Sequence, residues 1–349
     1  MRVMFVYYAF EDQGSGLVIQ GYSRAARALG HEVVVYGRDN PRIPLDYSLE
    51  VSAADAVVFI FEWTAELRYG DSFDYARIVA DVPRERRLIL DGDGKYNDLL
   101  RVDDDATHAD ADESRRWSEI CDSLTDKICQ PTLHPARPGV IPFLFYAYDP
   151  EWELPLDFAA KEFGMVYVGH SKYRWRPMLR VLQALEPIRA RVGRIGLVGE
   201  GWGSLPWWAT WMQIEDTYFS DAAYLEALGV EVMPPVPFTD VPRCMSRGVF
   251  NPVLLRPTFD HMRLVNPRMF ETPAAGTIPV FGIAESHVGE IYGEDGLALT
   301  LDGDGPERLE EIVARPEAYT DVVMTIRRHL AQEHSHEARL RQLISILEE

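Results

Sequence analysis

One short stretch of the chain combines a guanidinium group, a carboxylate and the signals that begin and end a helix. Arg268 and Glu271 are three residues apart, so a helix would place them on neighbouring faces. Asn266 is a good N-cap, Pro267 suits the first helical turn, and Gly276 is a natural residue to end the helix. Because ligands of α/β proteins gather at strand ends and helix N-termini, the charge pair indicates a ligand site. The alternative is an ordinary surface salt bridge.

A second group of residues combines a glycine with basic side chains at the end of an apolar run. The residues that follow the predicted strand at 165–168 include Gly169, His170, Ser171, Lys172, Arg174 and Arg176. A glycine lets the backbone approach a ligand, and the start of the following helix attracts anions. Basic groups at such a place are typical of a diphosphate site. The alternative is a solvated, basic start of a helix, with His170 as a satisfied polar group.

Glycines and arginines also follow two later apolar runs. The predicted strand at 195–198 leads into Gly199, Gly201 and Trp202. The glycines would let the chain turn beneath a ligand, whereas Trp202 could pack on the ligand or fill the core. The predicted strand at 248–255 leads to arginines that would concentrate positive charge at one strand end, namely Arg256, Arg263 and Arg268.

Alternating apolar and helical patterns indicate the elements that must position these groups. The predicted strands are 3–7, 32–36, 56–61 and 87–90 in the first half, and 165–168, 195–198, 230–233, 248–255, 277–281 and 297–301 in the second. Helical spacing of apolar residues lies between them, as at 19–29, 71–80 and 178–185, and continues at 306–349. Such alternation implies right-handed βαβ units and parallel sheets. The prolines between 131 and 155 predict a linker between two domains.

Length, composition and charge limit the class of protein. A chain of 349 residues with 47% hydrophobic residues can form about two domains with sizeable cores. The net charge of −20 argues against general binding to nucleic acid or to an anionic membrane surface. The three cysteines lack metal-ligand spacing and fit a reducing compartment. Since no window approaches ~20 apolar residues, we expect a cytoplasmic protein without a membrane span.

Two other segments could be taken for ligand sites. Gly14–Ser15–Gly16 lies in a predicted loop after the first strand but lacks the third glycine of a dinucleotide fingerprint, so NAD binding is not expected. The acidic segment 101–116 could supply metal ligands, yet it lacks the glycine turn and terminal glutamate of a calcium loop. We expect this segment to be a solvated loop and the protein to hold no metal.

The pattern Arg–x–Phe–Glu–x–x–Ala–x–Gly at 268–276 resembles the donor-site helix of GT-B glycosyltransferases. It is most similar to the CgeB-like, glycosyltransferase group 1-like branch, and Gly199–x–Gly201–Trp202 strengthens the likeness. The resemblance implies an α/β protein of the GT-B fold, with two Rossmann-like domains whose parallel sheets face a cleft. It implies an acceptor-side domain at 1–150, a nucleotide-sugar domain at 151–330 and a helix at 331–349 that packs back across the domains.

The resemblance also assigns roles to residues. Glu271 would bind the ribose hydroxyls, and Arg268 would stabilise the diphosphate. The other donor contacts would come from Gly169, His170, Ser171, Lys172, Arg174, Gly199, Gly201, Trp202, Arg256, Arg263 and Phe270. In the larger retaining group a glutamate stands eight positions before Glu271, where this chain has Arg263, so the stereochemical outcome stays open.

A transfer with inversion would need a base from the first domain. The carboxylates that follow its predicted strands are Glu11, Asp12, Glu62, Asp91 and Asp93, of which Asp91 and Glu62 are favoured. The expected function is metal-free transfer of a sugar from a UDP-, GDP- or dTDP-sugar to an acceptor hydroxyl, with a small natural product as one candidate acceptor. No other cofactor is expected. The alternatives are a sugar-nucleotide epimerase of the same fold and a non-catalytic nucleotide-binding protein.

Overall fold

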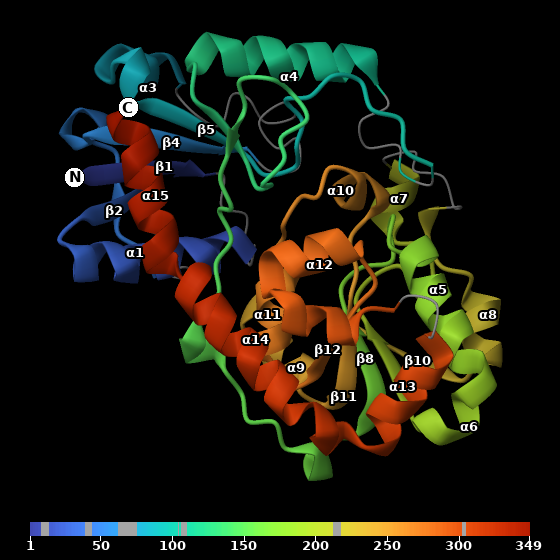
Figure 1. The fold of residues 1–349 in the computed structure, drawn as a ribbon. Helices are drawn as coiled ribbons and strands as arrows, with labels where there is room; N and C mark the ends of the chain where they lie inside the picture. Colours follow the sequence, from blue (N-terminus) through green and yellow to red (C-terminus); the bar gives the residue numbers. More distant parts are fainter. Residues whose placement is uncertain are drawn as a thin grey trace.

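The computed structural model describes residues 1–7, 14–38, 44–61, 75–103, 105, 110–211, 218–301 and 305–349. These residues form two α/β units, each with a parallel sheet (Figure 1). The strands of the first sheet, in spatial order, are β3 (Tyr47–Ser48), β2 (Glu32–Tyr36), β1 (Arg2–Tyr7), β4 (Ala56–Phe61), β5 (Arg87–Asp91), β6 (Ile128–Gln130) and β7 (Ile141–Pro142). Those of the second sheet are β10 (Val230–Met233), β9 (Ile195–Val198), β8 (Phe163–Val168), β11 (Gly248–Val253) and β12 (Ile278–Phe281).

The central strands are apolar because helices cover both faces of each sheet. All six residues of β4 and of β8 are buried, as expected for strands of a covered parallel sheet. The helices of the first unit are α1 (Gly14–Leu29), α3 (Tyr75–Asp81) and α4 (Ala111–Leu124). Those that follow are α5 (Trp175–Leu185), α6 (Arg189–Val192), α7 (Trp207–Trp211), α8 (Ala222–Ala227), α9 (Val241–Met245), α10 (Pro257–His261), α11 (Arg268–Ala274), α12 (Glu285–Tyr292), α13 (Gly305–Ala314), α14 (Thr320–Glu333) and α15 (His336–Glu348).

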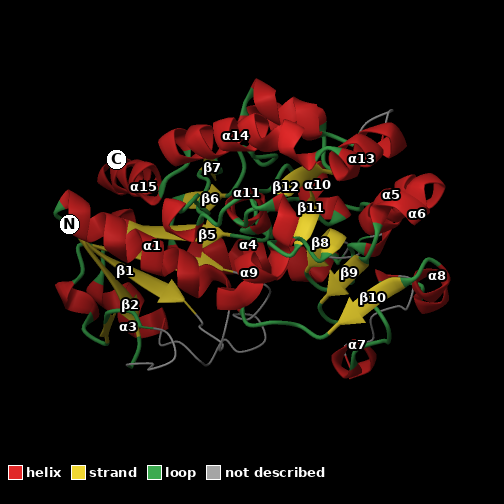
Figure 2. Ribbon diagram, turned by 90° about the horizontal axis from the view of Figure 1, so that it is seen from below, coloured by secondary structure: helices red, strands yellow, loops and turns green. Residues whose placement is uncertain are grey.

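The last two helices connect the units. In Figure 2, α14 and α15 run along one side of the molecule, α14 beside the second sheet and α15 beside the first. Helix α15 packs against α1, and the Lys127 Nζ donates hydrogen bonds to the carbonyls of Ile346 and Leu347 at 3.0 and 3.3 Å. The expected C-terminal helix that crosses back is therefore present. No helix of the described residues is long and apolar enough to cross a membrane.

Two predicted elements differ from the structure. The apolar run 297–301 is not a strand: residues Glu294–Leu299 form a 3-10 helix packed against α12 and α14, and Thr300 alone bridges to Phe281 of β12. Gly14–Ser15–Gly16 is not a loop, because α1 already begins at Gly14. Residues 71–74 of the predicted helix at 71–80 lie outside the described residues.

Candidate functional site

The carboxyl ends of β8 and β9 meet at three glycines. Gly169, Gly199 and Gly201 have φ values of +158°, +140° and +81°. A Cβ atom on Gly199 would lie 2.3 Å from the carbonyl oxygen of Gly169, so the two backbones pack as closely as they do because Gly199 lacks a side chain. Ser171 Oγ donates to the carbonyl of Gly201 at 2.6 Å, which links the two strand ends again.

Two aromatic residues of the predicted site lie in the core. Trp202 is fully buried, and its Nε1–H donates to the carbonyl of Gly169 at 2.7 Å. Phe270 is buried as well, with its ring 5.7 Å from that of His334 between the last two helices. Of the two roles open for Trp202, the structure therefore favours packing in the core, where it supports the loop at Gly169.

Cationic side chains gather beside these glycines. Arg174 lies 3.0 Å from Nε2 of His170, and both follow β8. Loss of solvation, and after it the positive charges of Arg174, Arg256, Lys172 and Arg268, lowers the pKa of His170 well below its usual value. Because the side chain of His170 is exposed to solvent, we attribute the lowering of its pKa mainly to the four positive charges. The predicted basic residues that follow two different strands, β8 and β11, thus come together, and we call these four side chains the cation cluster.

The Arg268–Glu271 pair is not an ordinary surface salt bridge. Glu271 is only 2% exposed, and its Oε2 accepts a short hydrogen bond from Arg268. The Nε of Arg268 also donates to the carbonyl of Val168, the last residue of β8, at 3.0 Å. The start of α11 is therefore fixed against the end of β8, which places the buried carboxylate beside the cation cluster.

Arg256 connects the cation cluster to the first unit. Its Nε lies 3.2 Å from Oδ2 of Asp105, and the backbone N–H of Thr258 donates to the same oxygen at 3.1 Å. Asp105 is buried, so the expectation of a solvated loop at 101–116 is wrong for this residue. Sequence reasoning missed Asp105 because its partner lies 151 residues further along the chain, in the other unit.

Arg263 belongs to a different group of side chains. It pairs with Glu290 at 3.2 Å, and His134 of the first unit binds the same carboxylate oxygen at 2.9 Å. It is absent from the charges that act on His170. Three arginines were expected at one strand end, but the structure brings only Arg256 and Arg268 together there, because the chain turns away at Arg263, whose φ is +51°.

Asp91 lies at the end of β5, as expected, but it is buried and hydrogen-bonded. Its carboxylate accepts from the backbone N–H groups of Lys95 and Tyr96 and from Nε2 of Gln130, each at 2.8 Å. Burial raises the pKa of Asp91 to about 6, although these hydrogen bonds oppose the shift. The contacts make Asp91 a support for the loop after β5. Glu62, the other favoured base, lies outside the described residues, as do Glu11 and Asp12.

Within the described ranges, no three His, Cys, Asp or Glu side chains form a group that could hold a metal ion. The polar groups of the site are instead the cation cluster, the buried Glu271 and the backbone at the three glycines. Such a set suits a ligand with two or more negative charges and hydroxyl groups.

Comparison with protein families gives one match. Residues 176–345 match the model of a family described as "Glycosyl transferase-like". This segment contains most of the second sheet, α11 and nearly all of the C-terminal helices. No curated protein sequence matched the chain.

Solved structures of glycosyltransferases share the fold over the whole chain. An α-glucosyltransferase in complex with UDP and a 13-mer DNA has a TM-score of 0.62 at 13% identity, covering 100% of this chain and 99% of the other. HepE from Anabaena, in complex with UDP and glucose, has a TM-score of 0.59 at 11% identity, covering 100% and 99%. T4 phage BGT, in complex with UDP and Mn²⁺, has a TM-score of 0.58 at 10% identity, covering 100% of both chains.

The fold is therefore the GT-B fold, as the sequence predicted. The expected resemblance to glycosyltransferases is confirmed by the family match and by these structures. The CgeB-like branch stays a prediction.

Proposed function

We propose that this protein transfers a sugar from a nucleoside-diphosphate sugar to an acceptor hydroxyl. The observation that carries the proposal is the buried Glu271 beside the cation cluster, at the carboxyl ends of β8 and β11. Ligands of open α/β sheets bind at this edge. The match of residues 176–345 to a glycosyltransferase-like family supports the same activity.

The donor would bind with its ribose at Glu271 and its diphosphate at the cation cluster. A carboxylate offers about four acceptor sites, so a Glu271 held by Arg268 can still accept hydrogen bonds from hydroxyl groups. Arg174, Lys172 and Arg268 would compensate the charge that develops on the diphosphate when its bond to the sugar breaks. Such electrostatic stabilisation is usually the largest contribution to catalysis.

Calorimetric titration of UDP, GDP, dTDP and NAD tests the donor site. We expect one nucleoside diphosphate to bind the wild type and to bind Glu271→Ala about 5- to 150-fold more weakly, the equivalent of about 1–3 kcal/mol for a lost buried hydrogen bond. Glu311→Ala is the matched control, because Glu311 pairs with Arg315 on an exposed helix face outside the site. Binding of NAD alone, or equal affinity in Glu271→Ala, would contradict the proposal.

Turnover separates this proposal from its alternatives. A glycosyltransferase consumes the donor and releases the nucleoside diphosphate, an epimerase converts the donor without an acceptor, and a binding protein leaves it intact. The proposed reaction needs no metal, whereas T4 phage BGT is known in complex with UDP and Mn²⁺. We therefore expect the same turnover in EDTA and in Mn²⁺, and a loss of turnover in EDTA would refute metal independence alone.

A further inference from the structure

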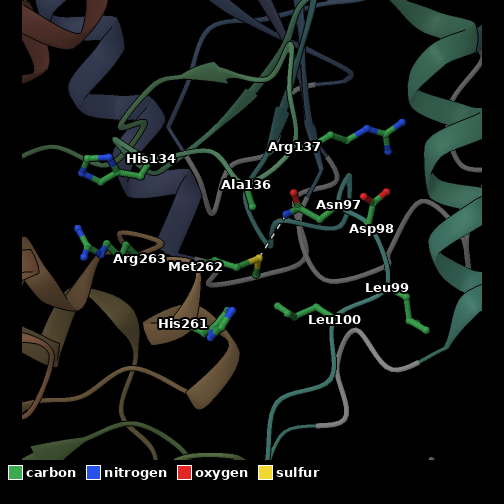
Figure 3. Close-up of a pocket in the computed structure, with 10 residues that line it drawn as sticks. All are labelled: Asn97, Asp98, Leu99, Leu100, His134, Ala136, Arg137, His261, Met262 and Arg263. Carbon is green, nitrogen blue, oxygen red and sulfur yellow. Dashed lines mark hydrogen bonds between the residues drawn. The ribbon is translucent and has the colours of Figure 1, made fainter.

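A pocket of about 250 Å³ lies between the two units. The loops after β5 and β6 form one wall, and the end of α10 forms the other. Figure 3 shows Asn97 and Leu100 on one side and Met262 and His261 on the other, with Arg137 pointing away. The pocket is thus built from both units.

Helix α10 relates the pocket to the cation cluster. Arg256 is the N-cap of this helix and His261 is its last residue. With a rise of 1.5 Å per residue, the two lie roughly 7.5 Å apart along the helix. The first unit contacts both regions, because Leu100 lines the pocket and Asp105 binds Arg256. The pocket and the cation cluster are therefore connected through the two ends of one short helix.

The lining of the pocket combines apolar side chains with polar and charged ones. Its apolar lining consists of Leu99, Leu100, Ala136 and Met262. Asn97 is 6% exposed, and its Nδ2 donates to the carbonyl of Gly94 and to Sδ of Met262. Its Oδ1 has no hydrogen-bond partner among the described residues. This oxygen is itself covered by protein atoms, so a ligand would reach it only after the Asn97 side chain turns.

Three of the basic side chains around the pocket are already engaged. His134 and Arg263 both bind Glu290, while Arg137 donates to Ser118 Oγ at 2.9 Å. The lining also holds the exposed carboxylate of Asp98, which disfavours an anion. An uncharged molecule with a hydroxyl group and an apolar body fits this lining best.

His261 completes the site. Its imidazole is exposed in the pocket and has no hydrogen-bond partner among the residues that the structure describes. Imidazole is the side chain that most often accepts a proton in enzymes. A base at this place would take the proton from the acceptor hydroxyl, a role for which Asp91 is too deeply buried.

Building on the function proposed above, we propose that this pocket binds the acceptor, a small hydroxylated molecule with an apolar or aromatic body, and that His261 is the catalytic base. The acceptor's hydroxyl proton passes to the imidazole as the oxygen forms a bond to the anomeric carbon. The bond from this carbon to the diphosphate oxygen breaks, and its electron pair leaves with the nucleoside diphosphate beside the cation cluster. A base that acts this way produces inversion at the anomeric carbon.

Acceptor binding is tested with a variant that fills the pocket. Ala136→Trp places a large ring at an exposed position of the lining, and Ala53→Trp is its control at an exposed position in the first unit outside the pocket. The probes are 4-methylumbelliferone and quercetin, two hydroxylated aromatic compounds, with methyl glucoside and maltotriose for comparison. We expect the aromatic probes to bind the UDP-loaded wild type and Ala53→Trp, and to bind Ala136→Trp at least tenfold more weakly. Calorimetry with UDP should give the same affinity for all three proteins.

The role of His261 is tested by rescue. His261→Ala should lower kcat for glucosylation of the bound probe by about 10²- to 10⁴-fold, and added imidazole should restore part of the rate. His31→Ala, a change at the far end of the first sheet, should leave kcat unchanged. Rescue distinguishes a base from a residue that only shapes the pocket.

The outcomes separate the two proposals. If the wild type binds no nucleoside diphosphate, the proposed function fails. If it binds one but holds only the sugars, holds none of the four probes, or loses nothing in Ala136→Trp, the acceptor pocket is wrong. If His261→Ala loses less than tenfold in kcat or is not rescued, the base is another residue.

Discussion

Glu271 shows what a buried carboxylate requires from its neighbours. A charge taken out of water is costly unless it is paired and hydrogen-bonded, and Arg268 supplies both. Arg268 also donates to β8, so it holds its own partner in place. A pair of this kind is a weak source of stability, and its retention at a strand end is better explained by what it positions.

The burial of Asp91 leads to a prediction about how the free energy of unfolding depends on pH. Its pKa is raised to about 6 in the folded protein, so the unfolded chain loses this proton at lower pH than the folded protein. The contribution of Asp91 to the free energy of unfolding is therefore most favourable below the unfolded pKa, and it falls as pH rises from about 4 through about 6. Above that range, the buried and ionised Asp91 lowers the free energy of unfolding by roughly 3 kcal/mol relative to its protonated form.

Urea unfolding of the wild type and Asp91→Asn, at about pH 4 and about pH 7, measures this contribution. We expect the advantage of the wild type over Asp91→Asn to be larger at the lower pH. Asp93 lies on the same loop and shows no such burial, so Asp93→Asn serves as the control. An unchanged difference between wild type and Asp91→Asn at the two pH values would show that Asp91 titrates normally.

At the scale of elements, the site depends on how closely the carboxyl ends of β8 and β9 approach each other. Gly199→Ala would place a Cβ atom 2.3 Å from the carbonyl of Gly169, at a φ of +140°. We expect a loss of about 1–3 kcal/mol in the free energy of unfolding from backbone strain, and more from the contact. Because the strand ends must separate, UDP affinity should fall as well.

Gly203→Ala is the matched control for this change. Its added Cβ would meet no atom closer than 3.5 Å, which is ordinary contact. Denaturant unfolding and UDP titration of both variants measure the difference. Equal stability of the two variants would mean that the close approach of the strand ends is dispensable.

The elements also show where sequence reasoning succeeds and where it stops. Apolar runs predicted β1, β4, β8 and β11, because strands buried on both faces leave a continuous signal. The run 297–301 carries a similar signal, yet Leu299 is its one fully buried leucine, in a 3-10 helix that packs against α12 and α14 rather than in the sheet. An apolar run indicates burial, but the run alone does not specify which element will bury it.

At the scale of the whole molecule, the GT-B fold could be predicted and the acceptor pocket could not. The Arg268–Glu271 pair is local in sequence, so its motif was visible. Asn97 and His261 are 164 positions apart and meet only through the arrangement of the two units. Arg263 shows the opposite case. It is close in sequence to Arg256 and Arg268, which suggested one cluster, but in the structure it pairs with Glu290 instead.

The overall charge leads to a prediction about partners. With a net charge of −20, the molecule repels a polyanion, and the cation cluster holds only four of its 35 Lys and Arg residues. Although one similar structure is a complex with a 13-mer DNA, we expect no retention of a 13-mer duplex in a gel-shift assay at low salt. UDP titration under the same conditions is the control, and tight DNA binding would overturn this expectation.

The position of α15 has a consequence for the order of folding during synthesis. Helix α1 leaves the ribosome long before α15, yet α15 covers part of its apolar surface in the folded protein. The surface of α1 that α15 covers therefore stays exposed while the second unit is translated. A nascent chain that ends before α15 would offer this uncovered face to chaperones.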